Sequence, residues 1–277
     1  MNEITHSLLG KKTIYVSHYD PSLLFPIARE IQRQQLALSA QLPFTGADIW
    51  SAYELSWLNP RGKPLVATAD IIVPCNTNNL VESKSLKLYL NSYNQSSFDS
   101  IESVQRQITS DLSEAVGGPI TVQLYPSTQR HLFTNTEFKG ICLDTLDIDI
   151  DTYKVKPNFL QLDAHRQTQP SVNEVLYSHL LKSDCPATGQ PDWGNLIIHY
   201  QGPAIDHEGL LRYIISFREH AEFAEHCVER IFMDIQQHCR PEKLSVYARY
   251  TRRGGLDINP FRSNFQDLPQ NLRCFRQ

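Results

Sequence analysis

The stretch SDCPATGQPDW, residues 183–193, holds a thiol and a carboxyl group that could act together. Cys185 opens a turn rich in proline and glycine, and Asp192 follows shortly after it. A thiolate is a strong nucleophile, and a nearby carboxylic acid can donate the proton that a covalent addition requires. The pair therefore indicates nucleophilic catalysis. The alternative is a thiol packed in the core beside an ordinary turn, which is the usual place of a free cysteine.

A second stretch, ESKSLK (82–87), carries residue types that bind phosphate. Lys84 and Lys87 fall one turn apart on the same face of a predicted helix, beside Glu82 and Ser85 at its start. Two ammonium groups and the unpaired backbone N–H groups of a helix N-terminus attract negative charge. This pattern predicts a site for a phosphate-bearing ligand, with a solvated helix face as the simpler alternative.

Three further groups of polar residues carry weaker signals. The acidic residues of 147–151 alternate with apolar ones, which favours a half-exposed strand over a cation site. The charged residues of 222–226 lie close together on a predicted helix, and at most one face of that helix can line a pocket. RRGG (252–255) could bind phosphate through arginines and backbone N–H groups, although a basic turn is equally common.

The elements that must position these residues occur twice in the chain. YLNSYNQ (89–95) lines up with YIISFRE (213–219) at an offset of about 124 residues, and VQR (104–106) lines up with VER (228–230). A polar stretch from about 153 to 172 joins the two copies. We therefore expect two domains, residues 1–155 and 156–277.

Each copy shows the same order of predicted elements: two strands, two helices and two strands. In the first copy these are a hairpin at 51–58 and 65–74, helices around 86–93 and 98–112, and strands at 120–125 and 142–151. In the second copy they are a hairpin at 175–182 and 195–202, helices that begin near 210 and 223, and a strand at 244–252 before the RRGG turn. The pattern predicts an α+β protein of two antiparallel ββααββ units with helices on one face.

The two copies differ in the residues that could do chemistry. Allowing one residue of length difference between the hairpin turns, Asn59 stands where Cys185 stands, and Leu65 where Asp192 stands. In the opposite sense, DHEGLL (206–211), the counterpart of ESKSLK, has no lysine. Nucleophile and anion site are thus predicted in different copies.

Composition narrows the class of protein further. The formal net charge of -4 offers no general basic field for a nucleic-acid backbone, so we expect no direct nucleic-acid binding. No apolar run resembles a signal peptide or a membrane span, which predicts a cytoplasmic protein. We expect the six cysteines of such a protein to be free thiols. Because the sequence has no C-x-x-C spacing, we expect no metal site beyond the weak pair His238 and Cys239. No G-x-G-x-x-G supports a dinucleotide-binding fold.

Four stretches together resemble the NADPH-dependent 7-cyano-7-deazaguanine reductases in their long two-module form: VESKSLKLYLNSYNQ (81–95), LLKSDCPATGQPDWG (180–194), EFAEHCVERIF (222–232) and RYTRRGGLDINPFRSN (249–264). This resemblance implies tunnelling-fold modules, related to GTP cyclohydrolase I, that assemble into a homodimer. It implies that NADPH reduces the nitrile of a 7-deazapurine to an aminomethyl group in the queuosine pathway of tRNA modification. Two NADPH molecules are consumed per substrate.

The resemblance also assigns roles by position. Cys185 would add to the nitrile carbon, giving a covalent thioimide, and Asp192 would protonate the nitrogen. The substrate-binding positions would be Val81, Glu82, Ser83 and Glu225. The NADPH-contacting positions would be Ser83, Lys84, Arg253 and Gly254. No metal is implied.

One residue departs from the family pattern. Where the family has a histidine directly before Glu225, this chain has Ala224, whose methyl group can neither hydrogen-bond nor transfer a proton. Either a neighbour such as His220 or His226 takes over, or the substitution traps an intermediate. Two other functions stay open as alternatives: a zinc-dependent pterin-type hydrolase on the same fold, and a purine-binding module without chemistry.

Overall fold

A computed structural model describes residues 15–127, 137–166, 171–271 and 273–277, which pack into two compact units. Of these residues, unit 1 contains 15–35, 47–127 and 252–258, and unit 2 contains the rest. The packing thus differs from a simple cut after residue 155, because 36–46 and 252–258 each join the unit built mainly by the other half. The division at 155 remains a proposal about where one copy of the sequence repeat ends.

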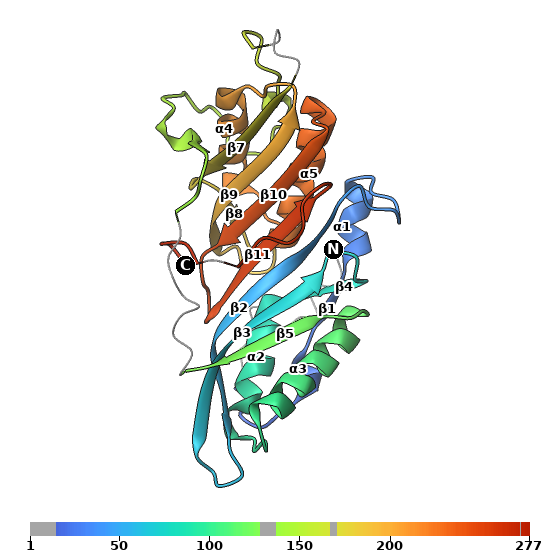
Figure 1. Cartoon of the computed structure of the whole chain (residues 1–277), viewed down its shortest axis with the longest axis vertical. Helices are drawn as coiled ribbons and strands as arrows, with labels where there is room; N and C mark the ends of the chain where they lie inside the picture. The colour runs from blue at the N-terminus through green and yellow to red at the C-terminus, as the bar shows by residue number, and fades with distance from the viewer. Residues whose placement is uncertain (1–14, 128–136, 167–170, 272) are drawn as a thin grey trace. The chain divides into compact units, whose positions relative to one another are not determined.

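Unit 1 is an antiparallel sheet covered by two helices (Figure 1). Its hairpin of β2 (Thr45–Leu58) and β3 (Pro64–Pro74) has a bulge between Ala52 and Leu55, and β3 also pairs with β5. The remaining elements are β1 (Pro26–Ala28), α1 (Arg29–Gln35), β4 (Asn79–Val81), α2 (Ser83–Ser92), α3 (Ile101–Val116) and β5 (Thr121–Pro126).

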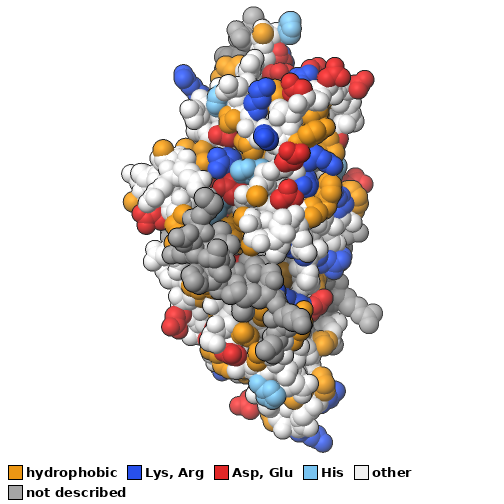
Figure 2. Space-filling model, turned by 180° about the vertical axis from the view of Figure 1, so that it is seen from behind, with side chains coloured by type: hydrophobic (Ala, Val, Ile, Leu, Met, Phe, Trp, Pro, Cys, Tyr) orange, Lys and Arg blue, Asp and Glu red, His pale blue; other side chains and the backbone are white. Residues whose placement is uncertain are grey.

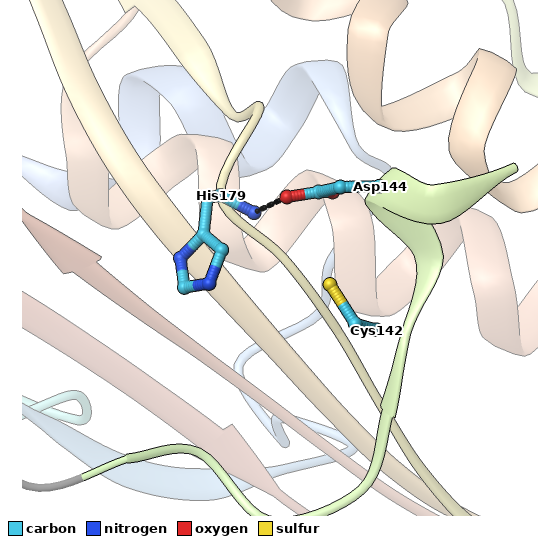
Figure 3. Close-up of side chains that lie close together, drawn as sticks. All are labelled: Cys142, Asp144 and His179. Atoms are coloured by element: carbon cyan, nitrogen blue, oxygen red, sulfur yellow. Dashed lines mark hydrogen bonds between the residues drawn. The ribbon is translucent and has the colours of Figure 1, made fainter.

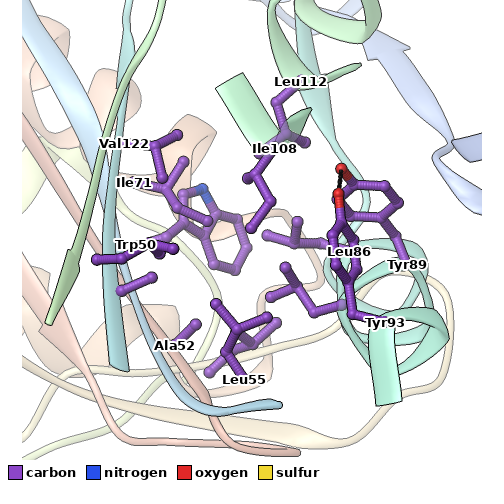
Figure 4. Close-up of a cluster of buried hydrophobic side chains, with 14 of the residues drawn as sticks. Trp50, Ala52, Leu55, Ile71, Leu86, Tyr89, Tyr93, Ile108, Leu112 and Val122 are labelled. Atoms are coloured by element: carbon purple, nitrogen blue, oxygen red, sulfur yellow. Dashed lines mark hydrogen bonds between the residues drawn. The ribbon is translucent and has the colours of Figure 1, made fainter. Parts of the chain in front are cut away.

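The core of unit 1 follows the two periodicities seen in the sequence (Figure 4). Alternate residues of β3 face inward, as the period of a strand requires. They meet helix residues spaced three and four apart, which form one apolar stripe on each helix. The buried residues involved are Ala67, Ala69, Ile71 and Val73 of β3, Leu86, Tyr89, Leu90 and Tyr93 from α2 and the turn after it, and Val104, Ile108, Leu112 and Val116 of α3.

Local signals fix the ends of α3. Ser100 caps the helix by accepting a hydrogen bond from the backbone N–H of Ser103, whose hydroxyl oxygen in turn accepts the backbone N–H of Ser100. Gly117 ends the helix with φ at 67°, a left-handed conformation in which a side chain would be strained. These caps set the helix at Ile101–Val116, which begins three residues later and ends four residues later than the range 98–112 expected from the sequence.

Unit 2 repeats the same plan with its helices on one face of the sheet (Figure 1). Its strands lie in the order β11-β10-β9-β7-β6, and the short β8 pairs with the first residues of β9. The elements are β6 (Ile141–Cys142), β7 (Val172–Ser178), β8 (Lys182–Asp184), β9 (Pro191–Gly202), α4 (His207–Ile215), α5 (Ala224–Cys239), β10 (Lys243–Tyr250) and β11 (Leu256–Ser263).

A buried ion pair holds α5 against the end of β11. The guanidinium of Arg262 donates from Nε and Nη2 to Oε1 of Glu229, at 3.0 and 2.9 Å, and both side chains are fully buried. A third nitrogen, Nη1, donates to the carbonyl of Phe261 at 3.0 Å. A buried ion pair is tolerated in a core when hydrogen bonds satisfy its polar atoms, and the three bonds donated by Arg262 meet this condition.

The predicted α+β class and its two antiparallel modules are confirmed, but two of the predicted strands are wrong in detail. The strand expected at 142–151 as the last one of the first copy is reduced to β6, Ile141–Cys142, which pairs parallel with β7 in unit 2, and the chain then forms a 3-10 helix, Leu143–Thr145. The strand expected at 175–182 breaks after Ser178. The two strand ends lie together, because the Asp144 carboxylate accepts hydrogen bonds from the hydroxyl of Ser178 and the backbone N–H of His179.

None of the described helices is both long and apolar enough to cross a membrane. On the face drawn in Figure 2, acidic and basic side chains are interspersed, and those in colour form no extended area of one sign. This mixed surface agrees with the small net charge of the whole chain.

Candidate active site

Cys185 stands at the mouth of the β8–β9 hairpin and is only 4% exposed. Its backbone N–H donates to the carbonyl of Gln190, and its carbonyl accepts from the N–H of Gly189, both at 2.9 Å. Asp192 lies in the first residues of β9, directly opposite Ser183 of β8. The hairpin therefore holds the backbone on both sides of the thiol in a closed turn.

The matching turn of unit 1 has the same hydrogen-bond pattern. There the N–H of Asn59 donates to the carbonyl of Lys63, and its carbonyl accepts from the N–H of Gly62, again both at 2.9 Å. The glycines of the two turns, Gly62 and Gly189, share a positive φ of 79° and 67°. This supports the expectation that Asn59 occupies the place of Cys185. The two turns have the same backbone conformation, with an amide side chain in unit 1 and a thiol in unit 2.

The thiol turn is tied by backbone hydrogen bonds to the segment that leads into α5. The N–H of Asp184 donates to the carbonyl of His220 at 2.7 Å, and the N–H of Glu222 donates to the carbonyl of Asp184 at 3.1 Å. α5 begins two residues later, and Glu225 lies buried in its first turn. Unit 2 thus brings together the strand before Cys185 and the helix start that carries Glu225.

Glu222 anchors this segment by its charge. Its buried carboxylate accepts two hydrogen bonds from the guanidinium of Arg230, at 3.0 and 3.3 Å, and lies 2.7 Å from Nε2 of His220. Burial alone would raise the pKa of this carboxyl group, but the hydrogen bonds from His220 and Arg230, together with the charge of Arg230, lower it to about 2. Sequence reasoning did not single out Arg230, although it lies only eight residues after Glu222.

Tyr250 is a second neighbour that the sequence did not reveal. It pairs with Gly194 across β9 and β10, and a Cβ atom on Gly194 would lie only 3.3 Å from its ring. Gly194 follows Asp192 by two residues, so both face the same side of the sheet. Burial raises the pKa of the Tyr250 phenol well above its usual value, and the charges of Cys227 and Asp192 raise it further. Tyr250 is therefore a neutral group close to the predicted acid.

Glu82, a predicted substrate ligand, is the N-cap of α2 in unit 1. Its Oε1 accepts the N–H of Lys84 and its Oε2 accepts the N–H of Ser85, both at 2.9 Å. The hydroxyl of Ser83 donates to the same carboxylate at 3.3 Å, and Val81 ends β4 directly before it. A carboxylate has about four acceptor positions, so this cap leaves capacity for further N–H donors.

The counterpart in unit 2 shows which part of this arrangement is structural. Asp206 caps α4 in the same way, accepting the N–H groups of Glu208 and Gly209 at 3.2 and 3.1 Å. Aspartate is the usual capping acid, whereas the longer Glu82 is not among the preferred residues. Capping explains an acid at both positions, but it does not explain the longer glutamate in unit 1.

Two of the predicted cofactor residues, Arg253 and Gly254, lie in a turn of unit 1 beside α2. The turn that contains Arg253 lies against α2, because a Cβ atom on Gly254 would be 3.8 Å from Cγ of Lys87. The ammonium group of Lys87 forms an ion pair with the carboxylate of Glu54. The side-chain charges of Lys84 and Arg253 suit an anionic ligand such as a phosphate, whereas two N–H groups of the first turn of α2 already donate to Glu82.

Two family models match this chain. Residues 15–124 match "Nitrile reductase, 7-cyano-7-deazaguanine-reductase N-term", and residues 191–268 match "QueF-like protein". The first match covers β2, β3, α2 and α3 of unit 1, and the second runs from β9 through α4, α5 and β10 to β11.

Relatives named NADPH-dependent 7-cyano-7-deazaguanine reductase match nearly all of the chain. Those from Burkholderia orbicola (strain MC0-3) and Burkholderia vietnamiensis (strain G4 / LMG 22486) are 56% identical over 273 residues, which cover 98% of this chain and 99% and 98% of theirs. The relative from Ralstonia nicotianae (strain ATCC BAA-1114 / GMI1000) is 55% identical over the full length of both chains. The chain belongs to the family of NADPH-dependent 7-cyano-7-deazaguanine reductases.

Proposed function

We propose that this oxidoreductase uses NADPH to reduce the nitrile of 7-cyano-7-deazaguanine to the aminomethyl group, through a covalent thioimide on Cys185. The product enters the queuosine pathway of tRNA modification, and the protein acts as a cytoplasmic homodimer without binding the nucleic acid itself. Family membership supports the reaction and the cofactor. The single observation that supports the role of Cys185 is the hydrogen-bonded link between the strand before it and the start of α5.

In the first step the thiolate of Cys185 adds to the nitrile carbon. The electron pair of one C–N π bond moves to nitrogen, which takes a proton from Asp192, and a C(=NH)–S thioimide results. The first hydride then adds to that carbon. Sulfur leaves as a thiolate, which regenerates Cys185 and releases an imine. The second hydride and one more proton complete the amine, so two hydrides and two protons are consumed.

NADPH supplies both hydrides when bound. Lys84 and Arg253 offer positive charge for its phosphates, and the hydroxyl of Ser83 and the backbone at Gly254 offer hydrogen-bond partners. Gly254 has a φ of 62°, a left-handed conformation that favours glycine, and a residue without a side chain lets a ligand approach its backbone closely.

Glu82 and Glu225 recognise the purine. Both carboxylates are almost fully buried, and each can accept N–H donors from the guanine-like edge of the substrate. Val81, buried next to Glu82, supplies apolar contact.

The test is to incubate the full chain with 7-cyano-7-deazaguanine and to follow protein mass and product. Without NADPH, we expect the mass of the protein to rise by that of one substrate molecule, with the label on the peptide that holds Cys185. With NADPH, we expect two cofactors oxidised for each amine formed. Binding of the substrate with neither adduct nor product would favour a purine-binding module instead.

Replacing Ala224 with histidine is expected to raise kcat. Ala224 is the first residue of α5 and is partly exposed, so an imidazole can be accommodated there and can take part in proton transfer, which typically contributes about 10²-fold or more. Steady-state kinetics of A224H against the parent chain measure this, with A224Q as a control of similar size that cannot titrate. An equal kcat for A224H and A224Q would show that a neighbouring group already serves.

A further inference from the structure

Cys142, Asp144 and His179 meet at the end of β7 although 37 residues separate the first from the last in the sequence (Figure 3). Cys142 ends β6, which runs parallel to β7 with Cys142 beside Tyr177, and Asp144 follows in the 3-10 turn. One potential ligand atom from each of the three residues lies within 4.8 Å of the other two. All three residues are partly exposed, so an ion can reach them from solvent.

The hydrogen bonds of His179 leave its Nε2 suited to a metal ion. Its Nδ1 lies 2.7 Å from Oδ1 of Asn195. The amide nitrogen of Asn195 donates to the carbonyl of Arg249 at 3.2 Å and to the sulfur of Cys274 at 3.3 Å, so its oxygen must face the imidazole. Nδ1 therefore carries the hydrogen and Nε2 the lone pair. Metal-binding histidines donate their other N–H in this way.

Asp144 and the imidazole ring are held in place by their neighbours. Oδ1 of Asp144 accepts the hydroxyl of Ser178 at 2.6 Å, and Oδ2 accepts the backbone N–H of His179 at 2.9 Å. The rings of Phe138 and Phe275 contact that of His179, with centroids 5.6 and 5.5 Å away. Because these side chains are already held in place, they lose less conformational entropy when an ion binds.

A second group of potential ligands in the described residues, His220, Glu222 and Cys227, lacks these properties. The carboxylate of Glu222 is already paired with the guanidinium of Arg230, whose charge repels a cation. Burial raises the pKa of the Cys227 thiol well above its usual value, which disfavours the thiolate that a metal needs. The contrast makes Cys227 a control for the first group.

We propose that Cys142 Sγ, Asp144 and His179 Nε2 bind one Zn²⁺ ion, with water in the fourth position. A mixed sulfur, nitrogen and oxygen set is typical of zinc, whereas calcium and magnesium take oxygen ligands only. On binding, the thiol of Cys142 gives its proton to solvent and forms the S–Zn bond. The ion joins the segment Ile141–Thr145 to the end of β7. It takes no part in the nitrile reduction, so this inference is independent of the proposed function.

Cobalt substitution tests the site directly. Full-length protein is treated with a chelator, which is then removed, and is titrated with Co²⁺ and afterwards with Zn²⁺. We expect one equivalent of Co²⁺ to give a thiolate-to-metal charge-transfer band in the near ultraviolet and intense visible bands of tetrahedral Co²⁺. Zn²⁺ should then abolish both.

The variants assign the ligands. C142S should lose the charge-transfer band, and D144N and H179Q should each weaken Zn²⁺ binding by at least about 10-fold. C227S should bind as the parent chain does. Zn²⁺ should also raise the melting temperature of the parent chain but not that of H179Q, and circular dichroism of each metal-free variant checks its folding. Absence of the band in the parent chain, or equal binding by the parent chain and a correctly folded C142S variant, would overturn the proposal.

Discussion

The variant C185A is expected to lose turnover by at least about 10³-fold, because the thiol of Cys185 is the nucleophile that forms the thioimide in the proposed reaction. The thiol is 4% exposed and its backbone closes the hairpin turn through Gly189 and Gln190. Alanine keeps those backbone hydrogen bonds, so the fold of the turn should persist. The measurement pairs initial rates of NADPH oxidation with the mass of the protein after incubation with substrate alone.

A matched control is C239A, which also removes a buried thiol from unit 2. Cys239 is the last residue of α5, and burial raises the pKa of its thiol to about 12, so it stays protonated and unreactive. This variant should keep the covalent adduct and the rate of the parent chain. An adduct that persists in C185A but disappears in C239A would mean that the nucleophile has been assigned to the wrong cysteine.

The variant E222Q is expected to lose about 3 kcal/mol of unfolding free energy at pH 7, the equivalent of its pKa shift. The pKa of Glu222 lies at about 2 in the folded chain against an ordinary value of 4.5, because His220 and Arg230 stabilise the charged form against the cost of burial. A lowered pKa stabilises the fold at pH values above 4.5. The contribution is lost as the pH falls from about 4.5 through 2. Urea denaturation at pH 7 and at a series of acid pH values measures it.

The same substitution at Glu208 provides the control. Glu208 pairs with Arg212 one turn along α4 at 3.2 Å, but its side chain is 54% exposed, so E208Q should cost less than about 0.5 kcal/mol. The parent chain and E222Q should approach each other in stability near pH 2. A difference between them that stays constant from pH 7 to pH 3 would show that lost packing, rather than charge, causes the effect.

Glu222 also connects stability with function. Its backbone N–H donates to the carbonyl of Asp184, which directly precedes the proposed nucleophile. We expect E222Q to loosen this connection and so to slow adduct formation.

The secondary structure that the sequence predicted well depends on local patterns. Apolar residues spaced three and four apart predicted α2 and α3, and alternation of apolar and polar residues predicted β3 and β9, because each of these elements buries one face. The prediction failed at 142–151, where alternating acidic and apolar residues resemble a strand. There Asp144 bonds to Ser178 and His179, and a contact with residues so far along the chain leaves no periodic signal.

In the candidate site, the two copies of the repeat can be compared residue by residue because their hairpin turns have the same backbone hydrogen bonds. The sequence showed that Cys185 and Asp192 replace Asn59 and Leu65, and the hydrogen bonds of the two turns agree with that alignment. It could not show that Glu82 caps a helix as Asp206 does, since capping depends on where the helix starts.

The amino-acid sequence by itself determined the α+β class, the repeat and the family, because periodicity and motif spacing are written along the chain. Only the tertiary structure decided that the strand before Cys185 pairs with the segment before α5, that Glu222 meets Arg230, and that Gly254 lies against Lys87. It also gathered the cysteine, aspartate and histidine that we propose as a zinc site, where spacing had predicted no metal. These contacts join distant residues, and their geometry follows from strand register and helix packing, which no local pattern encodes.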